Sequence, residues 1–188
     1  ISSTGQLKLQ STDSIIIGGN PFSVGGTNFY SKSTTYSTYT DAGTLVINGR
    51  DQAGYENGFS LTGPQGSSQN NLRLNGVITE NGCWTVSFDI RGTQSGSLPV
   101  TVDICDLGDQ TFYTNATNTY ERKSLTVNVT NYSAIYNFVD FAQFSYADYL
   151  IRNIKVEKGT QATDWSPAPS DPASGVKTSS VEVNSNGI

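Results

Sequence analysis

The amino-acid sequence predicts an all-β protein, an antiparallel β-sandwich of the jelly-roll type with short β-prone stem segments at both ends. First, no stretch shows the 3.6-residue apolar period of a helix, whereas short runs with alternating apolar residues recur along the chain. Second, the chain contains 23 Ser, 22 Thr, 16 Asn, 19 Gly and 10 Tyr. These residue types suit pleated surfaces and tight turns.

Length, composition and charge exclude several function classes. A chain of 188 residues is long enough for one domain with short flanking pieces. It contains no His, which excludes Ser-His-Asp catalysis, Cys-His catalysis and imidazole metal sites. A net charge of −5 argues against nucleic-acid binding, which needs a basic surface. No apolar run approaches membrane-spanning length, so we expect no membrane insertion.

Four segments differ in composition. Residues 1–19 are polar and β-prone, and we expect a stem or oligomerisation segment there. Residues 20–165 hold nearly all the aromatic residues and form the predicted jelly roll. Residues 166–176 carry three of the six prolines, which predicts a stiff linker, and 177–188 are expected to begin the next stem or domain. Because the stems cannot bury a face alone, we expect them to pair with another segment, often a copy of themselves in an oligomer. Both ends of the sequence are expected to be cuts through a longer polypeptide.

Short strands are predicted throughout the middle segment. Leu72 and Leu74 alternate with Asn71, Arg73 and Asn75, which predicts one buried and one polar face. The predicted strands of this kind are 44–48, 59–62, 71–78, 125–129, 134–141 and 149–157. The dense aromatic run at 135–149 is expected to lie in the core or a subunit interface.

Two longer strands, 83–91 and 98–106, are predicted to form an antiparallel hairpin. Each has an apolar residue at every second position, and the Thr-Gln-Ser-Gly-Ser segment between them suits a turn. In the expected register Trp84 faces Ile104 and Phe88 faces Val100.

The same register places Cys83 opposite Cys105. The two sulfur atoms are then expected to form a cross-strand disulfide or to remain adjacent reduced thiols, as they would in a reducing cytoplasm. Two cysteines without His cannot hold a structural zinc ion.

The end of the middle segment resembles a domain common in bacteriophage tail proteins. The motifs are Ile154-Lys-Val-Glu-Lys-Gly159 and Ala162-Thr-Asp-Trp-Ser-Pro-Ala-Pro-Ser-Asp171, which resemble that domain's closing strand and exit. The strand Trp84–Gly92 is similar to a strand of the same carbohydrate-binding-module-like jelly rolls, so the resemblance covers about residues 57–171. Related glycanase-associated modules have Ile-Asp-Asn-Val where this chain has Ile151-Arg-Asn-Ile154. Arg152 replaces the Asp, so no family calcium or sugar contact is transferred there.

The resemblance implies a non-catalytic module of a phage tail receptor-binding or baseplate protein that binds a host cell-surface saccharide. It further implies a homotrimer that contacts other tail proteins, is assembled in the bacterial cytoplasm and acts outside it, at the host surface, as part of the virion tail. Cytoplasmic assembly favours reduced cysteines. Two alternatives remain: a purely structural trimeric spacer or decoration module, and an accessory carbohydrate-binding module of a secreted glycan-degrading enzyme.

Saccharide recognition needs aromatic faces for stacking and planar polar side chains for hydrogen bonds to hydroxyl groups. The polar faces of the predicted strands supply four such candidates, and three tyrosines in turn-rich stretches could form a loop-borne platform. The candidate ligand-binding residues are Arg73, Asp89, Arg91, Asp103, Tyr36, Tyr39 and Tyr113. The alternative for these polar faces is an ordinary solvated or trimer-facing surface.

We expect no enzyme activity and no cofactor. The best catalytic arrangement would be the carboxylate pair Asp89 and Asp103, in the manner of a glycoside hydrolase, but carboxylates on a sheet surface are usually only solvated. Calcium binding by Asp106, Asp109 and Asp148 is the other option, and no Asp-x-Asp-x-Asp spacing supports it.

Overall fold

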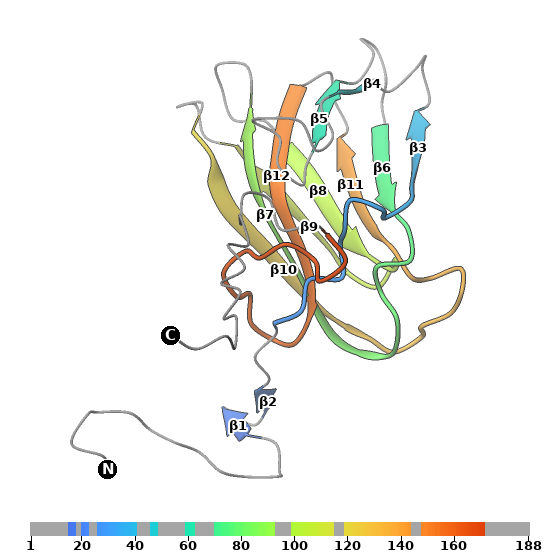
Figure 1. The fold of residues 1–188 in the computed structure, drawn as a ribbon, viewed down its shortest axis with the longest axis vertical. Helices are drawn as coiled ribbons and strands as arrows, with labels where there is room; N and C mark the ends of the chain where they lie inside the picture. Colours follow the sequence, from blue (N-terminus) through green and yellow to red (C-terminus); the bar gives the residue numbers. More distant parts are fainter. Residues whose placement is uncertain are drawn as a thin grey trace, which may run out of the picture.

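A computed structural model describes residues 15–17, 20–22, 26–40, 46–48, 59–62, 70–92, 99–114, 119–143 and 148–171. Within these ranges there is no helix, and all regular structure is antiparallel β-strand (Figure 1). Two five-stranded sheets form two layers, which confirms the predicted all-β antiparallel sandwich. Of the predicted stem at 1–19, residues 1–14, 18 and 19 lie outside the described residues, as do the linker residues 172–176 and the segment 177–188.

The first layer, here called the β7–β12 sheet, has the strand order β10-β7-β12-β5-β4. Its strands are β4 (Val46–Asn48), β5 (Phe59–Thr62), β7 (Gly82–Gly92), β10 (Glu121–Val129) and β12 (Asp148–Lys158). The second layer, the β6–β11 sheet, has the order β3-β6-β11-β8-β9. Its strands are β3 (Tyr36–Thr40), β6 (Asn70–Leu74), β8 (Pro99–Ile104), β9 (Asp109–Tyr113) and β11 (Val139–Gln143). Strands β1 (Ile15–Ile17) and β2 (Asn20–Phe22) pair separately with each other.

The core lies between the two sheets and is built from alternate residues of each strand. Leu72 and Leu74 are fully buried, as their alternation predicts. From the opposite layer, the Phe88 ring makes edge-to-face contacts with Phe112 and Phe141 at centroid distances of 5.6 and 5.1 Å. These contacts join β7 to β9 and β11 across the core, the arrangement expected of sandwich layers whose inner faces interdigitate.

The predicted hairpin between 83–91 and 98–106 is wrong. Strand β7 pairs with β10 and β12, whereas β8 pairs with β11 and β9 in the other layer. Trp84 is therefore opposite Val127 and Lys158, and Ile104 is opposite Val139. Alternation identifies the buried face of a strand, but two buried faces can meet across a core as well as belong to neighbouring strands.

The two cysteines are consequently not cross-strand neighbours, and both are free. Cys83 pairs in register with Asn128, and its thiol points to the Asn128 side-chain oxygen at 3.9 Å. Cys105 is buried in the turn after β8, where its thiol donates to the carbonyl oxygen of Phe138 at 3.6 Å. Neither the disulfide nor the adjacent-thiol prediction holds in this arrangement.

The remaining differences lie at strand ends and sheet edges. Strand 59–62 is as predicted, whereas the strand expected at 134–141 begins only at Val139. Residues 36–40, expected to be a turn-rich loop, form the edge strand β3, and the second edge strand, β9, was not predicted. An edge strand packs little apolar surface, so its sequence carries a weaker alternation signal. Within the aromatic run, Phe138 and Phe141 are buried as predicted, whereas Tyr136 is exposed.

Strand β12 contains a β-bulge that changes which segment covers its edge. The register with β7 shifts between Arg152 and Lys155, and Asn153 has a φ of 51°, a left-handed conformation that Asn tolerates better than most residues. Strand β5 pairs with β12 only at 148–151. Beyond the bulge, the lead-in segment (residues 26–35) takes its place, and the Phe29 amide donates to the Val156 carbonyl at 2.7 Å.

The Asn28 side chain fixes this junction. Its amide nitrogen donates to the carbonyl oxygens of Ile154 and Ser166, and its oxygen accepts from the backbone amides of Tyr30 and Val156, all at 3.0 Å. A side-chain amide has two donor hydrogens and two acceptor sites, so all four are used. One buried side chain thereby joins the lead-in segment, β12 and the residues that follow β12.

The exit segment (residues 159–171) folds back over the outer face of the β7–β12 sheet. Lys155 and Glu157 lie beneath it as an ion pair 3.5 Å apart, with side chains only 2% and 0% exposed. Thr163 bridges them, because its hydroxyl accepts from Lys155 at 2.5 Å and donates to Glu157 at 2.6 Å. At the end of the segment, the Lys32 amide donates to Asp171 at 2.8 Å. A buried charge pair is tolerated only with such complete hydrogen bonding. The low exposure of both side chains shows that this part of the sheet is closed to solvent.

Replacing Asn28 with Ala should lower the free energy of unfolding by about 3 kcal/mol, because several buried backbone groups lose their partner. Urea denaturation monitored by tryptophan fluorescence measures this loss. The matched control is Asn131→Ala, an exposed Asn whose side chain makes no hydrogen bond to the described residues, with an expected change within about 0.5 kcal/mol. Equal stabilities of the two variants would contradict the role of Asn28.

The cysteine positions predict two thiols of unequal reactivity. Burial raises the pKa of the Cys105 thiol, which lowers its thiolate fraction and its access to reagents. Iodoacetamide should label Cys83 in the native protein and Cys105 only after unfolding, as peptide mass spectrometry of non-reduced samples would reveal. Recovery of a Cys83–Cys105 disulfide peptide would overturn the observed register.

Candidate functional site

The outer face of the β6–β11 sheet carries a row of polar residues that crosses all five strands. Directly opposed residues of antiparallel strands project to the same face. The row alternates with the buried Leu72 and Leu74 on β6, so it faces away from the core. From β3 to β9 it consists of Ser37, Arg73, Asp140, Asp103 and Asp109.

Arg73 is held rigidly in this row. Its Nε and Nη2 atoms donate to the two carboxylate oxygens of Asp140 at 2.8 and 2.6 Å. The Arg73 Cζ atom lies 3.4 Å from the centroid of the Phe138 ring, so the guanidinium is stacked as well as paired. Burial raises the pKa of Asp140, whereas the hydrogen bond from Arg73 opposes that rise.

One edge of the Arg73 guanidinium remains available. The side chain is 36% exposed, and Nη1 donates to no residue that the structure describes. Beside it lies a depression of about 320 Å³ lined by Ser37, Thr38, Asn71 and Arg73. The Asn71 side-chain oxygen is buried there without a hydrogen-bond partner in the described part of the chain. A buried oxygen without a partner is unfavourable, which points to an acceptor site for a ligand hydroxyl or for water.

The tyrosine candidates lie at the two edges of this sheet. Tyr36 is 43% exposed on β3, and Tyr113 is 60% exposed on β9. With three strands between them, the two edge strands are roughly 19 Å apart. Tyr39 pairs in register with Asn71, and its side chain lies outside the described residues. The predicted loop-borne platform is therefore wrong, because these residues belong to strands. Tyr36 and Tyr113 lie on opposite edge strands, and Tyr36 is opposed to the buried Leu74, so it projects to the inner side of the sheet.

Asp103 supports the turn between β8 and β9. Its carboxylate accepts from the Asp106 amide at 2.7 Å. Cys105 and Asp106 have φ angles of 58° and 56°, and the Leu107 amide bonds to the Ile104 carbonyl, the geometry of a tight hairpin turn. Burial, and to a lesser degree the neighbouring carboxylates, raise the pKa of Asp103 to about 6.

Asp89 and Arg91 lie on the outer face of the other sheet, so the seven candidates do not form one surface. Asp89 accepts from Arg122 at 3.1 Å and from Asn153 at 2.8 Å, and these bonds support the bulge in β12. Because Asp89 and Asp103 project from opposite sides of the sandwich, they cannot flank one substrate, and the proposed glycosidase-like pair is wrong. The error follows from the incorrectly predicted hairpin, which placed the strands of Asp89 and Asp103 side by side in one sheet.

The metal and membrane possibilities receive no support from the described residues. In this part of the chain, no group of three or more Asp, Glu or Cys side chains is arranged to hold a metal ion. The Asp148 side chain lies outside the described residues. The same ranges contain no helix of the length and apolarity needed to span a membrane.

Three functional-site residues were missed from the sequence. Asn71 was assigned only to a polar face, whereas Phe138 and Asp140 were treated as part of an aromatic run. The alternation Phe138-Val-Asp-Phe141 contained the signal, because Asp140 stands between the core residues Val139 and Phe141 and must face outward. What the sequence did not contain was the neighbour across the strand, Arg73.

Comparison with known proteins identifies the fold but no family. No family model and no curated protein matches the sequence. Among solved structures, the chain is similar to the arabinose-bound α-L-arabinofuranosidase MgGH51, with 11% identity, a TM-score of 0.50, and coverage of 74% of this chain and 27% of that one.

Two further solved structures are similar at lower scores. The CBM22-1 xylan-binding domain of Paenibacillus barcinonensis Xyn10C matches with 13% identity and a TM-score of 0.45, over 72% of this chain and 94% of that one. Tailspike protein 4 of bacteriophage CBA120 matches with 13% identity and a TM-score of 0.41, over 69% and 20%. The chain spans only about a quarter of the arabinofuranosidase that it matches, and that match concerns the fold alone.

The raised pKa of Asp103 predicts a pH-dependent stability. The folded state favours the protonated carboxyl, so its contribution is full below the ordinary pKa of 3.8 and is lost as the pH rises through about 6. Asp103→Asn stays neutral and keeps the oxygen that accepts from Asp106. The stability of this variant relative to wild type should therefore improve between pH 3.8 and pH 6, as measured by urea unfolding across that window. A pH-independent difference would contradict the assignment.

Proposed function

We propose that this chain is a non-catalytic saccharide-binding module and that the saccharide binds at the depression on the outer face of the β6–β11 sheet. The observation that carries the proposal is the fixed Arg73 guanidinium, with Nη1 available, next to the unpartnered Asn71 oxygen. Sugar hydroxyls donate and accept at once, so a guanidinium donor beside an amide acceptor suits a pair of neighbouring hydroxyls. Because Asp140 and Phe138 already immobilise Arg73, binding costs little side-chain entropy.

The contrast between the two outer faces supports this choice. The exit segment closes much of the β7–β12 sheet, where Lys155 and Glu157 are fully bonded and inaccessible. On the β6–β11 sheet, every member of the polar row except the buried Asp140 is at least partly exposed, and a depression is present. A ligand approaching the sandwich therefore meets available polar groups on this face.

For the biological setting, we favour a phage tail receptor-binding or baseplate protein that binds a host cell-surface saccharide. The motifs at 154–159 and 162–171 support it, and in the fold they are the end of β12 and the exit segment. In this setting the module is part of a homotrimer in contact with other tail proteins, assembled in the bacterial cytoplasm and acting at the host surface as part of the virion tail. The loop around Ile135, which is 76% exposed, offers apolar surface for such contacts.

The second candidate is an accessory module of a secreted glycan-degrading enzyme. Such a module would bind its saccharide at the same depression on the β6–β11 sheet. The matched arabinofuranosidase contains a domain of similar fold within a much longer chain. The two settings differ in the source of the saccharide, bacterial surface or plant wall, and not in the residues that bind it.

A glycan array carrying bacterial surface polysaccharides and plant cell-wall oligosaccharides tests the proposal. The protein should bind at least one of them, and Asn71→Ala should weaken that binding at least tenfold because the variant lacks the acceptor. Its stability should change little, since the Asn71 oxygen has no partner to lose. Asn128→Ala, an exposed Asn on the other sheet, is the matched control and should bind normally.

A second variant keeps the test informative if Asn71 contributes little. The double change Arg73→Gln with Asp140→Asn retains a neutral hydrogen-bonded pair and removes the guanidinium. It should abolish binding while the fold persists in circular dichroism. A folded protein that binds no arrayed glycan, or variants that bind as wild type does, would refute the proposed function.

A further inference from the structure

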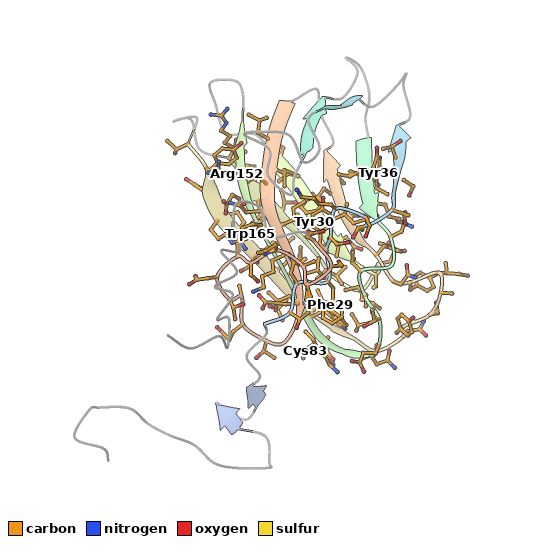
Figure 2. The ribbon with its side chains drawn as sticks, in the orientation of Figure 1. Phe29, Tyr30, Tyr36, Cys83, Arg152 and Trp165 are labelled. Atoms are coloured by element: carbon orange, nitrogen blue, oxygen red, sulfur yellow. The ribbon has the colours of Figure 1, made fainter. Side chains whose placement is uncertain are left out.

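A group of arginines lies on the part of the β7–β12 sheet that Lys155 and Glu157 do not occupy. Arg122, Asp89 and Arg152 are directly opposed across β10, β7 and β12. Arg91 is two residues beyond Asp89 on β7 and projects to the same face. Figure 2 shows Arg152 nearer the upper end of this sheet than Trp165 of the exit segment. Arg152 is also the residue at which the sequence departs from the Ile-Asp-Asn-Val pattern.

Arg122 uses three of its five N–H donors within the protein. Its Nη1 donates to Asp89 at 3.1 Å and to the Asn153 carbonyl at 2.6 Å, and its Nη2 donates to the Ser87 hydroxyl at 2.7 Å. These bonds hold the β-bulge of β12 against β7 and β10. Arg122 therefore has a structural role at the bulge.

Arg152 is positioned but not hydrogen-bonded. Its Cζ atom lies 3.8 Å from the centroid of the Tyr120 ring, and the Arg91 Cζ lies 5.0 Å from the same centroid. The Arg152 Nε is buried without a hydrogen-bond partner, and its 3.7 Å distance to Asp89 is too long for one. Neither Nη atom donates to a residue in the described ranges. The guanidinium is thus oriented by stacking, with its fork of donors unused.

Positive charge exceeds negative charge among the described side chains of this group. The Asp89 carboxylate lies within 4 Å of both Arg122 and Arg152, and it also accepts from Asn153. Two guanidinium groups approach one tyrosine ring, in a chain whose net charge is −5. Arg122 and Arg152 share the Asp89 carboxylate, so an anion beside Arg152 would be attracted by the remaining positive charge.

We infer that Arg152, flanked by Tyr120 and Arg91, forms a binding site for an anionic group of a polysaccharide, either a carboxylate or a sulfate. The unused donor fork of Arg152 suits two oxygens of one such group in a bidentate pair. The Tyr120 ring supplies an adjacent face for a sugar. This site lies on the sheet opposite to the Arg73 depression and stands whether or not that depression binds saccharide.

Two oligosaccharides, each with its own uncharged counterpart, test the site by isothermal titration calorimetry at low ionic strength. One is a hexagalacturonate, compared with its methyl ester, and the other is a sulfated hexasaccharide, compared with its desulfated form. At least one charged oligomer should bind at least tenfold more tightly than its counterpart and should lose that advantage in Arg152→Gln. Whichever oligomer behaves in this way identifies the anion as carboxylate or sulfate.

Three controls separate this site from other effects. Arg152→Lys keeps the charge but not the fork, so its affinity should fall between those of wild type and Arg152→Gln. The Arg73→Gln with Asp140→Asn variant, altered on the opposite sheet, should keep the difference in affinity between the charged oligomer and its uncharged counterpart, whatever affinity the two oligomers share. Thermal unfolding verifies that Arg152→Gln is folded. Equal affinity of wild type and folded Arg152→Gln for both charged oligomers, or binding lost only in the Arg73 variant, would overturn the inference.

Discussion

The fold depends most on the four hydrogen bonds of the Asn28 side chain. A β-bulge at Asn153 leaves strand β12 without its neighbour β5 over its second half, so backbone groups there need other partners. Asn28 supplies partners to Ile154 and Val156 and also holds the carbonyl of Ser166. Through this one amide, the lead-in segment is placed beside β12 and the exit segment is held over the sheet. A buried polar side chain is stable in this position because none of its donors or acceptors is left over.

This arrangement makes the two faces of the sandwich chemically different. Where the exit segment crosses the β7–β12 sheet, the polar side chains are used to bind the chain itself, as the Lys155–Thr163–Glu157 chain of hydrogen bonds illustrates. On the β6–β11 sheet, no described segment covers the row, so Arg73 and Asn71 retain unused hydrogen-bonding groups. The path of the exit segment therefore closes one part of the β7–β12 sheet, whereas the β6–β11 sheet and the Arg152 end of the β7–β12 sheet retain unused hydrogen-bonding groups.

Much of the fold was predictable because side-chain alternation reports which face of a strand is buried. Leu72, Leu74 and the alternate residues of β7 were assigned to the core correctly. Alternation does not report which strand lies next to which, so the register of Cys83 and Cys105 failed. Of the candidate site, Arg73 was identified from the sequence, but its partner Asp140 comes from a strand 67 residues away in the chain. Asp89 was assigned to a binding surface, whereas its role in the structure is to accept hydrogen bonds from Arg122 and Asn153. These bonds could not be predicted from the sequence, because they form only when three strands are assembled.

The central claim is that an immobilised guanidinium beside an unpartnered amide oxygen forms a saccharide site on the β6–β11 sheet. Nuclear magnetic resonance titration of the isotope-labelled protein with an uncharged oligosaccharide that it binds tests this most directly. The side-chain amide signals of Asn71 and the Nε–H signal of Arg73 should shift together and saturably, whereas the Asn28 amide, enclosed between β12 and the exit segment, should not move. Shifts confined to the β7–β12 sheet, with Asn71 and Arg73 unchanged at saturation, would contradict the account.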